Sequence, residues 1–167
     1  MRITRVDTDG IFHRYLIPKC AFLPTRGVGV AIDGRRFNRT GVEAPYLSRA
    51  PPTELEEYKQ RVSIVPPATL AAYSLLAEVA DLSPGIRPKI WGRRLARIGL
   101  CLTPDRLHRL ENPPSWKLAQ PIITAGLRGI LVPSLRHVGR TNLLIVPAII
   151  LSTVIMSRFM TRSPPAA

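Results

Sequence analysis

The sequence predicts an α+β fold in a single domain, and three observations support this. Segments with strand-like and helix-like patterns follow one another without the regular alternation that is typical of a parallel βαβ sheet. The 17 prolines and 11 glycines favour many short elements joined by turns. A chain of 167 residues has the length of one domain and can bury enough surface to fold without a disulfide framework or a structural metal.

Six segments are predicted to be strands because they are short, rich in apolar, aromatic and β-branched residues, and bounded by turn-forming residues. They cover 12–18, 35–38, 43–48, 69–75, 129–133 and 142–146. The last belongs to the most apolar run of the chain, 143–156. That run is shorter than the roughly 20 residues of a spanning helix, and Pro147 interrupts it, so we expect a buried strand rather than a membrane segment.

Two short helices are predicted between these strands. The first opens at the Pro51 break and lasts about two turns, with Thr53 as its N-cap and acidic residues in its first turn, where the helix dipole favours them. The second has Ser115 as its N-cap and ends near Ala125. Pro121 lies inside this helix and removes a backbone hydrogen bond, so we expect it to bend or shorten the helix.

Cysteine, histidine and charge content narrow the classes of function. Cys20 and Cys101 are isolated, which is typical of reduced thiols in a cytoplasmic protein, and the three histidines form no metal-binding cluster. Acidic residues near the N-terminus interrupt any signal-peptide core. Residues 1–90 hold 13 Lys/Arg and 9 Asp/Glu, whereas 91–167 hold 11 and 2, so the second half carries most of the net charge of +13. Such a charge suits a nucleic acid, an anionic small ligand or an acidic partner protein.

Three residues separated by ten and eleven positions suggest a nucleotide site. Arg36, Tyr46 and Glu57 supply a cation, an aromatic ring and a carboxylate. Together these groups can hold a dinucleotide and cleave its nicotinamide–ribose bond. The spacing gains weight from three later segments, PPSWKLA at 113–119, GILVPS at 129–134 and GRTNL at 139–143.

These segments, in this order, resemble the RES-domain proteins, the toxin half of bacterial RES–Xre toxin–antitoxin pairs. The hallmark GGRWN-like segment of that family is similar to GRRFN at 34–38, and its Tyr-x-Ser strand and helical Glu match Tyr46-Leu47-Ser48 and Glu57. Its later PPSW, GILxPS and GTNL segments match the three segments above. The resemblance predicts a RES domain over 10–147 and an atypical tail over 148–167.

The resemblance implies a fold and an activity. The fold would be similar to the ADP-ribosyltransferases, with a split β-sheet and short flanking helices around a site for NAD+. The activity would be cleavage of NAD+ by hydrolysis, phosphorolysis or transfer of ADP-ribose to a protein, with NAD+ as substrate and no further cofactor. The implied partner is an Xre-family antitoxin that covers the site, in a cytoplasmic complex that could include a homodimer. Neither a membrane nor specific nucleic-acid recognition by the chain itself is expected.

Three residues would carry the chemistry. Glu57 would stabilise the oxocarbenium-like sugar and hold a ribose hydroxyl. Arg36 would bind a pyrophosphate or ribose oxygen, and Tyr46 would stack on the cationic nicotinamide ring. Each has a plainer interpretation: a solvated helix glutamate like Glu54 and Glu56, a surface charge, and a half-buried strand tyrosine.

Three further residues complete the candidate site. Ser134, at the end of a predicted strand, could bind phosphate or ribose, and Asn142 could order the site from the neighbouring strand. Arg14, on the first strand, is a weaker candidate for a phosphate contact. A strand-end serine without a functional role is the alternative interpretation of Ser134.

The chain also departs from the family pattern. Arg35 replaces the second hallmark glycine, Phe37 replaces the tryptophan, and Arg140 replaces the glycine usual before TNL. The stretches 92–112 and 148–167 match nothing in the family, and we hypothesise that both are out of frame relative to an ancestral gene. If the tail supplies no last strand, the sheet has an unpaired edge.

Two other functions therefore stay open. One is a catalytically impaired RES relative that acts only as a protein-binding module. The other is a basic nucleic-acid-binding domain.

Overall fold

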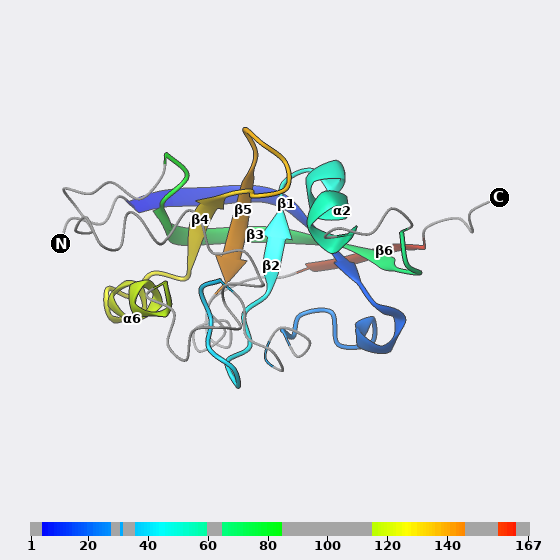
Figure 1. The fold of residues 1–167 in the computed structure, drawn as a ribbon, viewed down its shortest axis with the longest axis horizontal. Coiled ribbons are helices and arrows are strands. Elements are labelled where there is room, and N and C mark those ends of the chain that lie inside the picture. The colour runs from blue at the N-terminus through cyan, green and yellow to red at the C-terminus, as the bar shows by residue number, and fades with distance from the viewer. Residues whose placement is uncertain are drawn as a thin grey trace.

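The structure, a computed structural model, describes residues 5–27, 31, 36–59, 65–84, 115–145 and 157–162, with the backbone alone for 5–8, 117–120 and 157–162. Within these ranges the chain forms a mixed six-stranded sheet with two short α-helices, which confirms the predicted α+β class (Figure 1). The elements are β1 (Arg5–Leu16), the 3-10 helix η1 (Pro18–Cys20), β2 (Tyr46–Ser48), α2 (Pro51–Lys59), β3 (Thr69–Asp81), α6 (Trp116–Thr124), β4 (Gly129–Pro133), β5 (Thr141–Ile145) and β6 (Ser157–Arg162).

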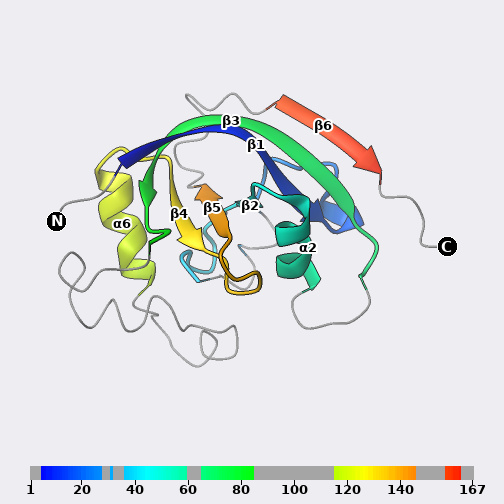
Figure 2. The same ribbon diagram turned by 90° about the horizontal axis from the view of Figure 1, so that it is seen from above.

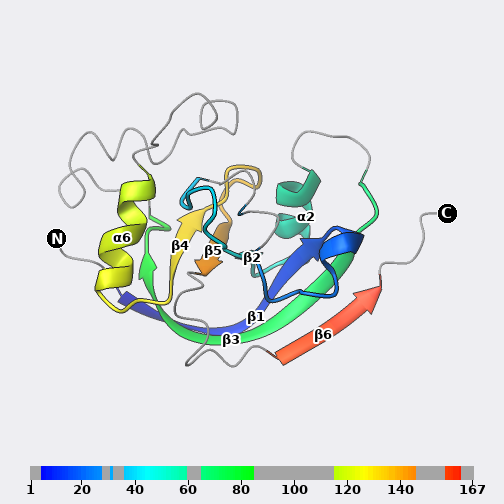
Figure 3. The same cartoon turned by 90° about the horizontal axis from the view of Figure 1, so that it is seen from below.

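A long antiparallel pair, β1 with β3, carries the rest of the fold. Its register runs from Arg5 opposite Ala80 to Leu16 opposite Thr69. Figures 2 and 3 show this pair as a curved band, with β2, β5 and β4 on its concave side and α2 and α6 toward its two ends. The band therefore holds the three short strands and both helices on one side.

The sheet closes on itself because β1 pairs with both β2 and β3. The strand order is β1-β2-β5-β4-β3-β6, with the β1–β3 pairing in addition. Among the described strand pairs, only β3 and β4 run parallel, and Ala80 lies opposite Ile130. β6 pairs with the first half of β3, so a strand within the atypical tail covers that edge.

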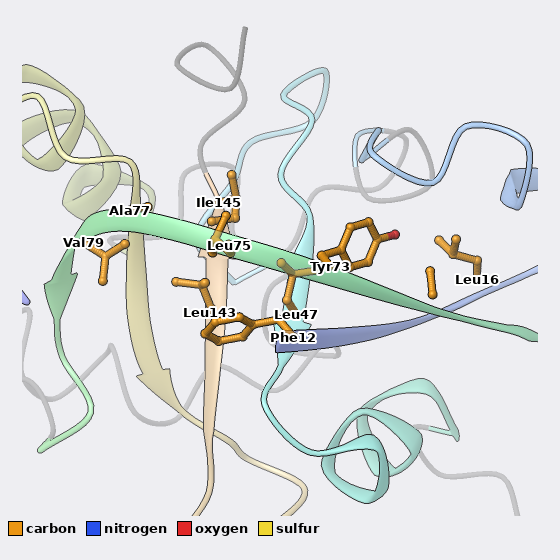
Figure 4. Packing of buried hydrophobic residues seen from close by; sticks show 10 residues of the cluster. Phe12, Leu16, Leu47, Tyr73, Leu75, Ala77, Val79, Leu143 and Ile145 are labelled. Atoms are coloured by element: carbon orange, nitrogen blue, oxygen red, sulfur yellow. The ribbon is translucent and has the colours of Figure 1, made fainter. Parts of the chain in front are cut away.

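Two apolar clusters lie on opposite faces of β5, because successive strand residues point to opposite sides. Figure 4 shows Phe12, Leu47, Tyr73 and Leu143 in the first cluster, which fills the space between the β1–β3 band and the short strands. The second cluster is formed by buried residues of β3, β4, β5, α6 and the segments around them: Phe37, Ala44, Ala80, Leu82, Ile122, Leu127, Ile130, Val132 and Leu144. β5 is thus buried on both faces, and its position is fixed from both sides.

Several predicted boundaries need correction. β1 begins at Arg5, well before 12, because its pairing with β3 continues through the whole length of both strands. β3 runs to Asp81 for the same reason. The strand predicted at 43–48 contains only Tyr46–Ser48, because Pro45 has no N–H to donate to a ladder. The segment 36–38 is a turn with an isolated bridge, not a strand.

The helices differ from expectation at their N-termini. α2 starts at Pro51, so Thr53 lies inside the helix and is not its N-cap. Ser115 precedes α6, but its side chain makes no capping hydrogen bond. Pro121 does lie within α6. No helix in the described ranges is long and apolar enough to cross a membrane, and 92–112, which is predicted to diverge, lies outside those ranges.

The alternation of β3 can be tested with two adjacent leucines. Leu75 is 1% exposed in the first cluster, whereas Leu76, on the opposite face, is 65% exposed. We expect Leu75→Ala to lower the free energy of unfolding by about 2–5 kcal/mol, because it opens a cavity. Leu76→Ala should change it by less than about 0.5 kcal/mol. Urea unfolding measures both, and equal losses would contradict the register.

Candidate active site

The carboxylate of Glu57 is held by two donors, one on β5 and one directly after β4. Its Oε1 accepts a hydrogen bond of 2.6 Å from the Ser134 hydroxyl and one of 2.7 Å from Nδ2 of Asn142. Glu57 lies on α2, Ser134 directly follows β4, and Asn142 is on β5. Three of the predicted site residues, distant in sequence, therefore meet at one oxygen atom.

Strand register explains this convergence. Asn142 is opposite Ser48 on β2 and opposite Val132 on β4. Ser134 comes two residues after Val132, so it points to the same face as Val132 and Asn142. Tyr46 comes two residues before Ser48 and shares that face as well. The pairing β2–β5–β4 therefore lines up a row of polar groups beneath α2.

The turn after β4 fixes the orientation of Ser134. The backbone N–H groups of Arg136 and His137 donate to the Ser134 hydroxyl oxygen at 3.3 and 3.0 Å, so the hydroxyl proton is available for Glu57. The same turn is joined to α2, because the Thr53 hydroxyl lies 3.1 Å from Nδ1 of His137. Helix and turn are thus positioned together.

Sequence reasoning missed two members of this polar group, Ser48 and Glu54. The Ser48 hydroxyl lies 2.7 Å from Oδ1 of Asn142 and 2.9 Å from Oε2 of Glu54. Ser48 is fully buried and Glu54 is 7% exposed, so the interpretation of Glu54 as a solvated glutamate is wrong. The signal was present in the spacing: Glu54 and Glu57 are three residues apart and share one helix face.

Burial changes the protonation of Glu54. Loss of solvent raises the pKa of its carboxyl group to about 8, and the nearby Glu57 acts in the same direction. The Ser48 hydroxyl, the charge of Arg14 and a backbone hydrogen bond at Tyr15 oppose this shift without cancelling it. Glu54 is therefore largely protonated at neutral pH.

Arg36 and Tyr46 are joined through the segment 36–38. The Tyr46 hydroxyl accepts a hydrogen bond of 3.1 Å from the N–H of Phe37 and donates one of 3.2 Å to Oδ1 of Asn38. The Arg36 guanidinium carbon lies 4.8 Å from the centre of the Phe37 ring, a cation–π contact. Arg36 is buried, so its interpretation as a surface charge is wrong, whereas Tyr46 is half-buried on β2, as its plainer interpretation also predicts.

Arg14 has a different setting from the other candidates. It is buried on β1, and its Nη1 donates a hydrogen bond of 2.8 Å to the carbonyl of Arg26. Its charge acts on the carboxyl groups of Glu54 and Glu43. Arg14 therefore acts on the site through its charge, which favours the ionised form of Glu54.

The arrangement fixes the position of the Glu57 carboxylate, which can then stabilise a positive charge on a bound ligand. Two donors hold Oε1 of Glu57, and no described residue donates a hydrogen bond to Oε2, which keeps its capacity to accept one. A metal site has no support in the described part of the chain, where no three His, Cys, Asp or Glu side chains lie close enough to share an ion.

The protein is an α+β domain in which a serine and an asparagine hold the carboxylate of a helical glutamate. A sequence profile of the RES domain matches residues 11–157, and the chain belongs to this family. Its fold is similar to a chain in the crystal structure of the M. tuberculosis MbcT–MbcA toxin–antitoxin complex, with a TM-score of 0.58 at 18% sequence identity over 94% of this chain and 86% of that one. No curated protein sequence matches the chain significantly.

The link between Tyr46 and the Arg36 segment can be tested by removing one hydroxyl. Tyr46→Phe leaves the Phe37 N–H and Asn38 Oδ1 without this partner, so we expect a loss of about 1–3 kcal/mol in the free energy of unfolding. Tyr58→Phe is the control, because its hydroxyl donates to the Pro67 carbonyl at an exposed position; its loss should stay below about 1 kcal/mol. Denaturant unfolding compares them, and an equal loss in both would contradict the anchoring role of Tyr46.

Proposed function

We propose that this chain is a RES toxin that cleaves the nicotinamide–ribose bond of NAD+ and is neutralised by an Xre-family antitoxin. The observation that carries the proposal is the Glu57 carboxylate, with Oε1 held by Ser134 and Asn142. Membership of the RES family and the fold similarity to a chain of a toxin–antitoxin complex support it.

The chemistry follows from the leaving group. Nicotinamide leaves NAD+ from a cationic ring, so the bond can break without a general acid, and positive charge develops on the ribose. A carboxylate already oriented toward that charge stabilises the transition state without reorganising. Glu57 is suited to this because Ser134 and Asn142 fix its position. Its second oxygen would hold a ribose hydroxyl.

Arg36 and Tyr46 would bind the rest of the substrate. Tyr46 would stack on nicotinamide, which is favourable while the ring is cationic. The Arg36 guanidinium would bind the pyrophosphate or a ribose oxygen. Ser134, whose hydroxyl proton is directed to Glu57, would act mainly by orienting that carboxylate. The acceptor of ADP-ribose would be water, phosphate or a protein side chain.

A charge of +13 supports an acidic ligand or partner. An antitoxin that covers the site with acidic side chains would complement this positive charge, and a positively charged partner would be disfavoured.

The proposed activity can be tested in cells. Expression of the chain alone should deplete cellular NAD+, and co-expression of an Xre-family protein encoded beside it should restore the NAD+ level. Unchanged NAD+ levels with the antitoxin absent would contradict the proposed activity.

The role of Glu57 can be tested on one helix with one substitution type. Glu57→Gln keeps the shape but removes the charge, so we expect NAD+ consumption to fall by about 10²–10³-fold, as when a preorganised electrostatic group is lost. Glu56→Gln is the matched control, because Glu56 is 46% exposed and pairs only with Lys59 among the described residues. It should keep nearly full activity in the same assay.

Other results would favour the two alternatives. A Glu57→Gln variant as active as the wild type would remove Glu57 from the mechanism. A wild type that binds the antitoxin but leaves NAD+ intact would indicate a protein-binding module. Steeply salt-dependent binding to DNA without NAD+ turnover would indicate a nucleic-acid-binding domain.

A further inference from the structure

The Ser48 hydroxyl has two partners that both accept hydrogen bonds in their ordinary forms. It lies 2.7 Å from Oδ1 of Asn142 and 2.9 Å from Oε2 of Glu54. A serine hydroxyl carries one proton, so it can donate to one of these oxygens only. The second contact, between buried oxygens, needs a proton from elsewhere.

The orientation of Asn142 decides where the Ser48 proton goes. Nδ2 of Asn142 donates to Oε1 of Glu57 at 2.7 Å, so the amide oxygen must face Ser48. An amide oxygen has no proton to give, and therefore Ser48 donates to it. The Glu54 contact is then satisfied only if Glu54 itself carries a proton and donates it to the Ser48 oxygen.

We propose that Glu54 is a positioning residue that acts in its protonated form, at the start of a hydrogen-bond chain from Glu54 through Ser48 and Asn142 to Glu57. The inference rests on the proposed function, because the position of the Glu57 carboxylate matters for NAD+ cleavage. In this chain each donor fixes the next group, and the last donor fixes Oε1 of Glu57.

The surroundings of Glu54 explain why it stays neutral. Arg14 on β1 and the backbone hydrogen bond at Tyr15 favour the ionised form, as does the Ser48 hydroxyl on β2. Burial and the charge of Glu57 on the same helix favour the neutral form, and they prevail, with a pKa of about 8. From the turn after β4, His137 contacts the neighbouring Thr53.

Ionisation of Glu54 would reverse the chain. Ser48 would turn its proton toward the new carboxylate, and Oδ1 of Asn142 would lose its donor. Asn142 would then hold Glu57 less firmly, and a second negative charge would lie on the same helix face. The site is therefore expected to work below about pH 8 and to lose activity above it.

The experiment is the pH profile of kcat and KM for NAD+ in the full chain. Between pH 7 and 9 a group of this pKa goes from roughly nine-tenths to one-tenth protonated, so the wild-type kcat should fall about tenfold with KM little changed. Glu54→Gln carries an amide that donates to Ser48 at every pH. It should remain active at pH 7 and lose the alkaline fall.

Two comparison variants sharpen the result. Glu54→Leu removes the donor, so its kcat at pH 7 should be at least about tenfold below that of Glu54→Gln. Glu56→Gln leaves the chain intact and should keep the wild-type alkaline fall. An alkaline fall that persists in Glu54→Gln, or equal kcat values for Glu54→Gln and Glu54→Leu, would overturn the proposal.

A stability measurement separates this proposal from the proposed function. Because the pKa of Glu54 is raised in the folded state, folding takes up a proton between the unfolded and folded pKa values. The contribution of Glu54 to the free energy of unfolding is fully present below about pH 4.5 and is lost as the pH rises to about 8. The wild-type Tm should therefore fall over this range relative to Glu54→Gln. If the Tm values of the wild type and Glu54→Gln changed in parallel with pH, Glu54 would not be protonated in the folded protein. This result would overturn the proposal even if the chain consumes no NAD+.

Discussion

The position of β5 between β2 and β4 is the constraint on which the site depends. β5 presents Asn142 to Ser48 on one neighbour and aligns it with Val132 on the other, so that Ser134 reaches the same face. A shift of one residue in either register would turn Asn142 toward the first apolar cluster, which contains Phe12 and Tyr73. The same shift would bring Leu143 to the face of Ser48 and Ser134. Burial of Leu143 and Ile145 in one cluster and Leu144 in the other opposes such a shift.

Helix α2 is held to the sheet by polar contacts, together with the ring contact of Tyr58 with Tyr15 on β1. Its buried residues are Thr53 and Glu54, neither of which contributes much apolar surface. Thr53 reaches the turn after β4, Glu54 reaches β2, and Glu57 reaches β4 and β5. The same bonds therefore dock the helix and orient the carboxylate, so changes in protonation bear on both.

The sequence predicted the parts of the site that lie in motifs, and it predicted the buried strands at 129–133 and 141–145 almost to the residue. Of the three glutamates of ELEEY it singled out Glu57, through the family resemblance, but it did not separate Glu54 from Glu56. Glu56 pairs with Lys59, Glu57 is held by Ser134 and Asn142, and Glu54 is buried against Ser48. Once Glu57 is assigned to the site, the spacing places Glu54 on the same helix face, but the burial of that face against the sheet is decided by tertiary packing.

Long-range pairing accounts for the other misses. The full lengths of β1 and β3 follow from their mutual ladder, because residues of average strand propensity are stabilised once a partner is present. β6 lies in a stretch without family motifs, yet it pairs with β3 over six residues. A helix start was misplaced because two prolines occupy the first positions of α2, where the missing N–H groups have no intrahelical partner to lose.

The most direct test of the central claim is a crystal structure of the Glu57→Gln variant with NAD+ bound. The account places the nicotinamide ribose within hydrogen-bond distance of residue 57, with the nicotinamide ring on Tyr46 and Arg36 at the pyrophosphate or a ribose oxygen. NAD+ bound away from residue 57, in a protein whose wild type consumes it, would contradict the assignment of this carboxylate.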